Sequence, residues 1–211
     1  FATDQGGRGF QLPAHIAVRS DNRIFVASRG RGPTVGVQMV SRDFEFFGKI
    51  GSQGKATGQM IEPSAIAFDS VENLYVADEK LNRITRFDYE GEVIDSWGEA
   101  GSEPGQFDHP TGLLIRDEIV FVVDALNNRI QKYTTSGDFI DQWGGQGSDR
   151  DSLKYPWGIT SAANGDIFVA DWGNDRVVRF TEDGQFVSDI HKGEGASLPL
   201  NRPADVAVDQ D

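Results

Sequence analysis

The chain has 211 residues, a formal net charge of −13 and no cysteine. The lack of cysteine excludes disulfides, cysteine-ligated zinc, iron–sulfur clusters and thiol nucleophiles. The acidic excess disfavours binding to nucleic acids and anionic membranes, which depends on lysine and arginine. No apolar run approaches the roughly 20 residues of a membrane-spanning helix. Twenty-five glycines among many aromatic and β-branched residues favour short strands and tight turns.

Five prolines in matching contexts mark an internal repeat. They lie about 47 residues apart, and each opens a small-residue pair followed by an apolar stretch. We interpret each stretch as the first strand of a repeat, the last one being 206–208. The prolines are Pro13, Pro63, Pro110, Pro156 and Pro203.

Three more strands are predicted after each first strand. The second is a nearly continuous apolar run, as at 74–78, which predicts burial on both faces. The third alternates apolar and polar residues, as at 83–87, which predicts a half-exposed strand. A glycine-bearing turn leads to the fourth strand, where Trp97 and Trp143 recur and are interpreted as packing between repeats.

Four short antiparallel strands at this period match one blade of a β-propeller, so the chain is predicted to be all-β. The repeated pattern runs from Gly-Gln-Phe-x-x-Pro through Val-Ala-Asp and Asn-Arg-Ile to Trp-Gly. Its clearest copy extends from Gly58 to Gly98. This set of motifs resembles NHL repeats, and the resemblance implies an NHL-type propeller that has six blades when complete.

We expect one domain over 1–211 that holds about four and a half of these blades. The repeats span about 9–57, 58–104, 105–151 and 152–198, with a partial fifth at 199–211. The rest of the fifth blade and the sixth are then missing, and Phe1 is interpreted as the tail of an outer strand of the closing blade.

Several recurring polar residues are expected to be structural. Three aspartates end the second strands, and each lies five residues before an arginine: Asp78, Asp124, Asp171 and Arg83, Arg129, Arg176. Each aspartate is expected to accept hydrogen bonds from turn amides and from its arginine. Arg86 and Lys132 are expected to pair with Asp95 and Asp141 on the adjacent strand.

The first functional hypothesis is a non-catalytic binding or scaffolding surface formed by the loops of one propeller face. Scaffold positions recur while loop tips vary, as a rigid recognition surface requires. The ligand is expected to be a protein, a peptide or a glycan, and no cofactor is expected. The sequence is compatible with a cytoplasmic or an extracytoplasmic location. The candidate binding residues are Arg29, Arg31, Lys80, Trp157 and Trp172.

The alternative is a metal-dependent lyase or hydrolase with its site on the propeller axis. His15 and Asp205 occupy equivalent positions in their repeats and are candidate ligands for zinc or calcium. The first repeat is similar to peptidyl-α-hydroxyglycine α-amidating lyases, which are zinc- and calcium-containing propellers, and this implies a catalytic Arg29. That family has metal-binding histidine directly after the blade proline. Those positions here hold Ala14, Ser64, Thr111, Trp157 and Ala204.

Overall fold

The structure is a computed structural model that describes residues 10–193 and 197–209, so the interpretation of Phe1 lies outside the described residues. Four four-stranded antiparallel sheets follow one another, with the strands of each sheet in chain order. The first strands are β1 (Pro13–Val18), β7 (Pro63–Phe68), β11 (Pro110–Arg116) and β15 (Pro156–Ser161). The second strands are β2 (Ile24–Ser28), β8 (Leu74–Asp78), β12 (Ile119–Asp124) and β16 (Ile167–Asp171).

The third strands are β3 (Gly36–Val40), β9 (Arg83–Phe87), β13 (Arg129–Thr134) and β17 (Arg176–Phe180). The fourth strands are β4 (Phe46–Ile50), β10 (Val93–Trp97), β14 (Phe139–Gly144) and β18 (Phe186–Ile190). A short parallel pair, β5 (Ser52–Gln53) and β6 (Gln59–Met60), lies in the connection between the first two sheets. Two 3-10 helices, η1 (Gly32–Thr34) and η2 (Trp172–Asn174), follow second strands.

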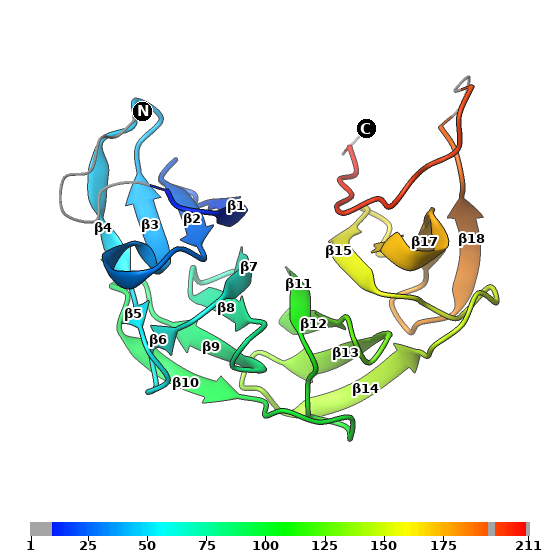
Figure 1. Ribbon diagram of the computed structural model, residues 1–211, viewed down its shortest axis with the longest axis horizontal. Coiled ribbons are helices and arrows are strands. Elements are labelled where there is room, and N and C mark those ends of the chain that lie inside the picture. Colours follow the sequence, from blue (N-terminus) through cyan, green and yellow to red (C-terminus); the bar gives the residue numbers. More distant parts are fainter. Residues whose placement is uncertain (1–9, 194–196, 210–211) are drawn as a thin grey trace.

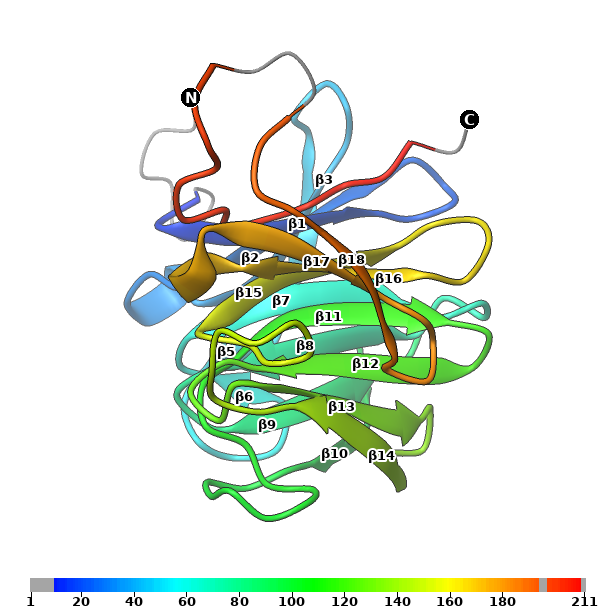
Figure 2. The same ribbon diagram turned by 90° about the vertical axis from the view of Figure 1, so that its right-hand side faces the viewer.

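The four sheets are propeller blades, as the sequence predicts. Their first strands line the inside of an arc and their fourth strands the outside, and the arc leaves a gap between β1 and the C-terminal segment (Figure 1). In the perpendicular view, η1 and η2 lie on the same side of the molecule, which we call the loop face (Figure 2). Closure into six blades stays a prediction.

The fifth repeat differs from the expectation. Residues 206–208 were predicted to form a first strand, but the structure places no strand between 203 and 209. The physical reason is that a β-strand needs a hydrogen-bonded neighbour, and no second strand follows in the described part of the chain.

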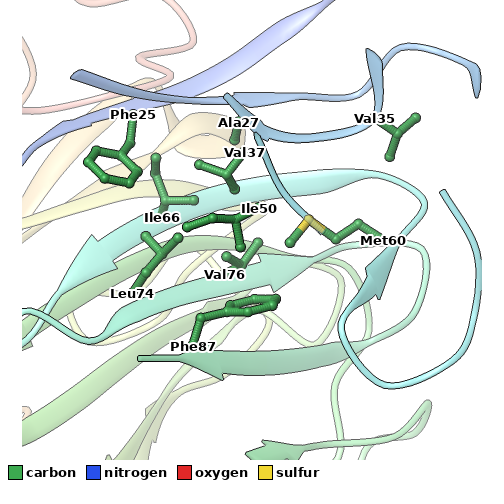
Figure 3. Close-up of a cluster of buried hydrophobic side chains, with 10 residues drawn as sticks. All are labelled: Phe25, Ala27, Val35, Val37, Ile50, Met60, Ile66, Leu74, Val76 and Phe87. Atoms are coloured by element: carbon green, nitrogen blue, oxygen red, sulfur yellow. The ribbon is translucent and has the colours of Figure 1, made fainter. Parts of the chain in front are cut away.

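Each apolar core lies between two blades rather than within one. Figure 3 shows the first, where Phe25 and Val37 of the first blade meet Ile66 and Leu74 of the second. Equivalent clusters join the second blade to the third and the third to the fourth. All five residues of β8 are buried, as predicted, because both faces of this strand are covered.

The third strands are more buried than their alternation predicts. The side chains of Thr85 and Gln131 are buried despite being polar, because a neighbouring blade covers each face of the sheet. Trp97 and Trp143 do pack between blades: Trp97 lies 6.1 Å from Tyr133 and Trp143 lies 6.2 Å from Phe180 of the following blade, measured between ring centroids.

The first strands approach one another closely on the inside of the arc. The Ser64 hydroxyl donates to the carbonyl of Pro110 in the next blade at 2.6 Å. A Cβ on Gly112 would lie 2.5 Å from the carbonyl oxygen of Trp157. A side chain at position 112 would therefore collide with the backbone of the next inner strand.

The predicted aspartate–arginine pairs form in two of three blades. Nε of Arg129 lies 2.8 Å from Asp124, and Nε of Arg176 lies 2.8 Å from Asp171. Asp78 instead accepts the turn N–H groups of Lys80 and Leu81, both at 3.0 Å. The Arg83 guanidinium hydrogen-bonds carbonyls of the preceding connection: Lys55, Ala56 and Gln59.

The predicted ion pairs between third and fourth strands form once. Arg86 contacts Asp95 at 2.6 Å. The pairing of Lys132 with Asp141 was wrong: the lysine reaches Glu182 in the next blade at 3.2 Å, because its flexible side chain extends across to that turn.

A second hydrogen bond joins the second, third and fourth blades to the repeat that follows each of them on the loop face. The residue before the third strand adopts a left-handed conformation, with φ of 52° at Asn82, 56° at Asn128 and 56° at Asp175. Its side-chain oxygen accepts the backbone N–H of the residue that precedes the next blade's proline. The three donors are His109, Tyr155 and Arg202, at 2.9, 2.9 and 2.8 Å. Although it forms no strand, the start of the fifth repeat is therefore docked like the start of a blade.

Replacement of Asn128 tests this joint. Asn128→Ala should lower the free energy of unfolding by about 2 kcal/mol, because it removes the acceptor for Tyr155 and because alanine adopts the left-handed conformation at φ 56° less readily than asparagine. Asn128→Asp should retain most of the stability, since Asp175 already plays this part in the next blade. Urea denaturation measures both, and equal losses for the two variants would contradict the role of the acceptor.

Candidate functional site

The strand register places three variable positions of each blade on the loop face. Each blade proline pairs with the last residue of the second strand: Pro13 with Ser28, Pro63 with Asp78, Pro110 with Asp124 and Pro156 with Asp171. The residue before the proline, the residue after it and the residue after the second strand therefore meet at the inner rim of the loop face.

These rim positions vary while the surrounding scaffold repeats. The residues before the proline are Leu12, Glu62, His109, Tyr155 and Arg202. The residues after the second strand are Arg29, Glu79, Ala125 and Trp172. Variation at loop positions on a repeated framework makes this surface a candidate for specific recognition.

Two adjoining cavities open at this rim. A cavity of about 470 Å³, the channel cavity, is lined by the starts of the first strands together with His15, Arg29 and Asp205. A cavity of about 280 Å³, the loop-face cavity, lies between Arg29, Glu79, His109 and the aromatic residues of the fourth blade. Both are close to or within the usual size range of ligand pockets.

Three aromatic side chains of the fourth blade form one wall of the loop-face cavity. We call Tyr155, Trp157 and Trp172 the aromatic cluster. Trp172 lies 6.4 Å from Tyr155, edge to face, and 6.2 Å from Trp157, measured between ring centroids. Tyr155 is 43% exposed and Trp157 39% exposed, so both present ring surface to solvent. Rigid, partly exposed aromatic rings beside a cavity are typical anchors for a bound partner.

Trp157 also breaks a structural series. The residues at its position in the second and third blades, Ser64 and Thr111, donate their hydroxyls to carbonyls of the following blade. Tryptophan has no hydroxyl and gives up this contact. Its side chain instead lines both cavities.

Arg29 and Glu79 form an ion pair at the opposite wall, across the first two blades. Their side chains are 2.9 Å apart and largely buried. Burial raises the pKa of the Glu79 carboxyl, and the Arg29 charge opposes that shift. The lyase resemblance implies a catalytic role for Arg29, but the guanidinium of Arg29 is already paired with the Glu79 carboxylate.

His15 and Asp205 line the channel cavity together, as the metal hypothesis requires. The site is incomplete in other respects, because no third histidine or carboxylate gathers with them in residues 10–193 and 197–209. Catalytic zinc sites use three protein ligands. The described residues thus do not fit the zinc and calcium centres that the lyase resemblance implies.

The structure brings together Arg29, Trp157 and Trp172 of the candidate binding residues. Arg31 and Lys80 are exposed on neighbouring loops and line neither cavity. Sequence reasoning did not single out Tyr155 or Arg202 as site residues. The signal available for both was their place directly before a blade proline, where the left-handed backbone directs side chains to the rim.

Comparison with known proteins supports the NHL assignment. Residues 153–180 match the NHL repeat family. The chain is similar to Protein brain tumor of Drosophila melanogaster, with 34% identity over 67 residues that cover 32% of this chain and 6% of that protein. The expected resemblance to NHL-repeat propellers is confirmed, and the fold supports a binding or scaffolding role in general.

Solved structures show the same fold in several proteins. A catalytically inactive virginiamycin B lyase from Staphylococcus aureus with quinupristin superposes with a TM-score of 0.66 at 16% identity, over 90% of this chain and 57% of that one. The hydrazine synthase of Kuenenia stuttgartiensis gives a TM-score of 0.64 at 18% identity, over 90% and 50%. The chain thus spans about half the length of these structures. Identities this low show a shared fold.

In the described part of the chain, no helix is both long and apolar enough to cross a membrane.

The environment of His15 predicts a pH dependence of stability. Burial lowers the pKa of His15, although Asp205 opposes the shift, and Nδ1 faces the N–H of Ile66 at 3.5 Å as an acceptor. In the unfolded chain the imidazole protonates near its ordinary pKa of about 6.5, so stability present above that pH is lost as the pH falls. His15→Gln should lose less stability than the wild type between about pH 7 and 5, measured as the urea midpoint. An equal loss in both proteins would contradict this assignment.

Proposed function

We propose that this chain is a non-catalytic recognition module that binds a peptide segment of a partner protein on the loop face. The observation that carries the proposal is the aromatic cluster, which is partly exposed beside a cavity and occupies variable positions of a regular repeat. Tyr155 and Trp157 act as anchors, and the Arg29–Glu79 ion pair forms the polar wall opposite them.

A protein ligand agrees with the chemistry of this surface better than a nucleic acid does. The net charge of −13 repels phosphates, and Arg29 in the cavity is neutralised by Glu79. NHL repeats commonly mediate protein interactions. An extended peptide would place side chains between the rings while its backbone crosses the rim.

Selection from a displayed random-peptide library tests the proposal. Peptides that bind the wild type should be enriched, and Trp157→Ala should weaken the best of them by about 30-fold, the loss typical of an aromatic anchor. Titration calorimetry with the selected peptides measures the effect.

A matched pair of tyrosines controls for nonspecific loss of apolar surface. Tyr89 is 48% exposed in the turn between β9 and β10, on the side opposite the loop face. Tyr155→Ala should weaken binding, and Tyr89→Ala should not. Failure to enrich any peptide, or equal binding to both variants, would overturn the proposal. Stoichiometric zinc or calcium surviving dialysis of the full chain would favour the lyase alternative.

A further inference from the structure

The side of the aromatic cluster nearest the C-terminal segment is already covered by a cation. The guanidinium carbon of Arg202 lies 4.6 Å from the centroid of the Trp172 ring. This is within the distance at which a cation is attracted to the face of a tryptophan. Trp172 therefore presents a ring face that accepts a guanidinium group.

The backbone of Arg202 is held independently of its side chain. Its N–H donates to Asp175 Oδ1 at 2.8 Å, the joint shared with His109 and Tyr155 in the preceding blades. The side chain of Arg202 makes no ion pair among those found in the described residues, whereas Arg29 on the far wall is paired with Glu79. The guanidinium can thus leave the ring without undocking the segment.

The charge of the molecule favours a cationic partner. The chain carries 33 acidic and 20 basic residues. A field of this sign attracts positively charged segments and speeds their encounter with the surface. In the wall of the loop-face cavity the charge of Arg29 is compensated by Glu79, so the positive charge that an incoming guanidinium has to displace is that of Arg202.

We infer that the aromatic cluster recognises an arginine side chain of a partner peptide, which takes the face of Trp172 that Arg202 covers in the free protein. This inference rests on the proposed function and names the class of ligand. Arg202 is then an internal competitor. The partner's guanidinium would replace its contact with the ring while Asp175 keeps the segment in place.

A pair of small probes tests the inference without a known ligand. Acetyl-arginine methylamide and its citrulline counterpart have nearly the same shape, but only the first carries a charge. In ¹H–¹⁵N spectra of the full chain, arginine should shift the indole N–H signal of Trp172 and bind about two- to fivefold more tightly than citrulline, the range for an exposed cation–π contact. Equal binding of the two probes would overturn the inference.

Variants test the competition. Arg202→Gln should tighten arginine binding by about two- to fivefold, because the internal cation is removed while the backbone joint remains. Lys55→Gln makes the same charge change at an exposed lysine of another connection and should have no such effect. In a Trp172→Ala background, Arg202→Gln should have no effect either. Additive effects of the two substitutions would overturn the role of Arg202.

The outcomes separate this inference from the proposed function. Selected peptides that depend on Trp157 but lack arginine, together with an unmoved Trp172 signal, would overturn the inference alone. An arginine-specific shift of Trp172 without any selected peptide would leave the cation site standing and remove the peptide-binding role.

Discussion

The burial of each sheet's two faces by neighbouring sheets is the constraint on which this structure depends. A single four-stranded blade has no core of its own, and its apolar residues leave water only where the next blade covers them. The second strands are apolar up to their last residue for this reason, and even third-strand polar residues such as Gln131 are buried. Hydrogen bonds on the loop face then fix the position of one blade relative to the next.

Most of the fold could be predicted from the sequence because the same residue types recur at the same structural positions in several repeats. In the second, third and fourth blades, the aspartate that ends the second strand accepts a backbone N–H of the connection before the blade proline, and the arginine five residues later donates to a carbonyl of that connection. The contacts between blades were harder to predict, since they depend on the reach of long side chains. Lys132 shows this: its neighbour across the strand is Asp141, but its partner is Glu182 of another blade. Arg83 likewise holds backbone carbonyls where an ion pair with Asp78 was expected.

The candidate site could be predicted only in part, because irregular positions carry it and repetition cannot align them. Trp157 and Trp172 stood out as tryptophans away from the fourth strands. Tyr155 and Arg202 did not, although each lies directly before a proline, because their role depends on a left-handed backbone that brings separate blades together. Predictable and unpredictable positions differ for a physical reason. The residue type is constrained where a side chain hydrogen-bonds the scaffold, whereas neighbouring rim residues can differ from blade to blade.

The narrow inner wall of the arc also governs its curvature. Ala65, Gly112 and Gly158 occupy the same place in the second, third and fourth blades, where the first blade has His15. Strand β15 lies directly against Gly112, and the backbone of Ala204 and Asp205 lies against Gly158. Each blade is a wedge, and the angle between neighbouring blades increases as the inner edge becomes thinner than the outer edge. Bulkier residues at these three places would thicken the inner edge, reduce the tilt between units and widen the circle they trace. The tilt between the second, third and fourth blades thus depends on the absence of bulk at a few positions of the narrowest circumference.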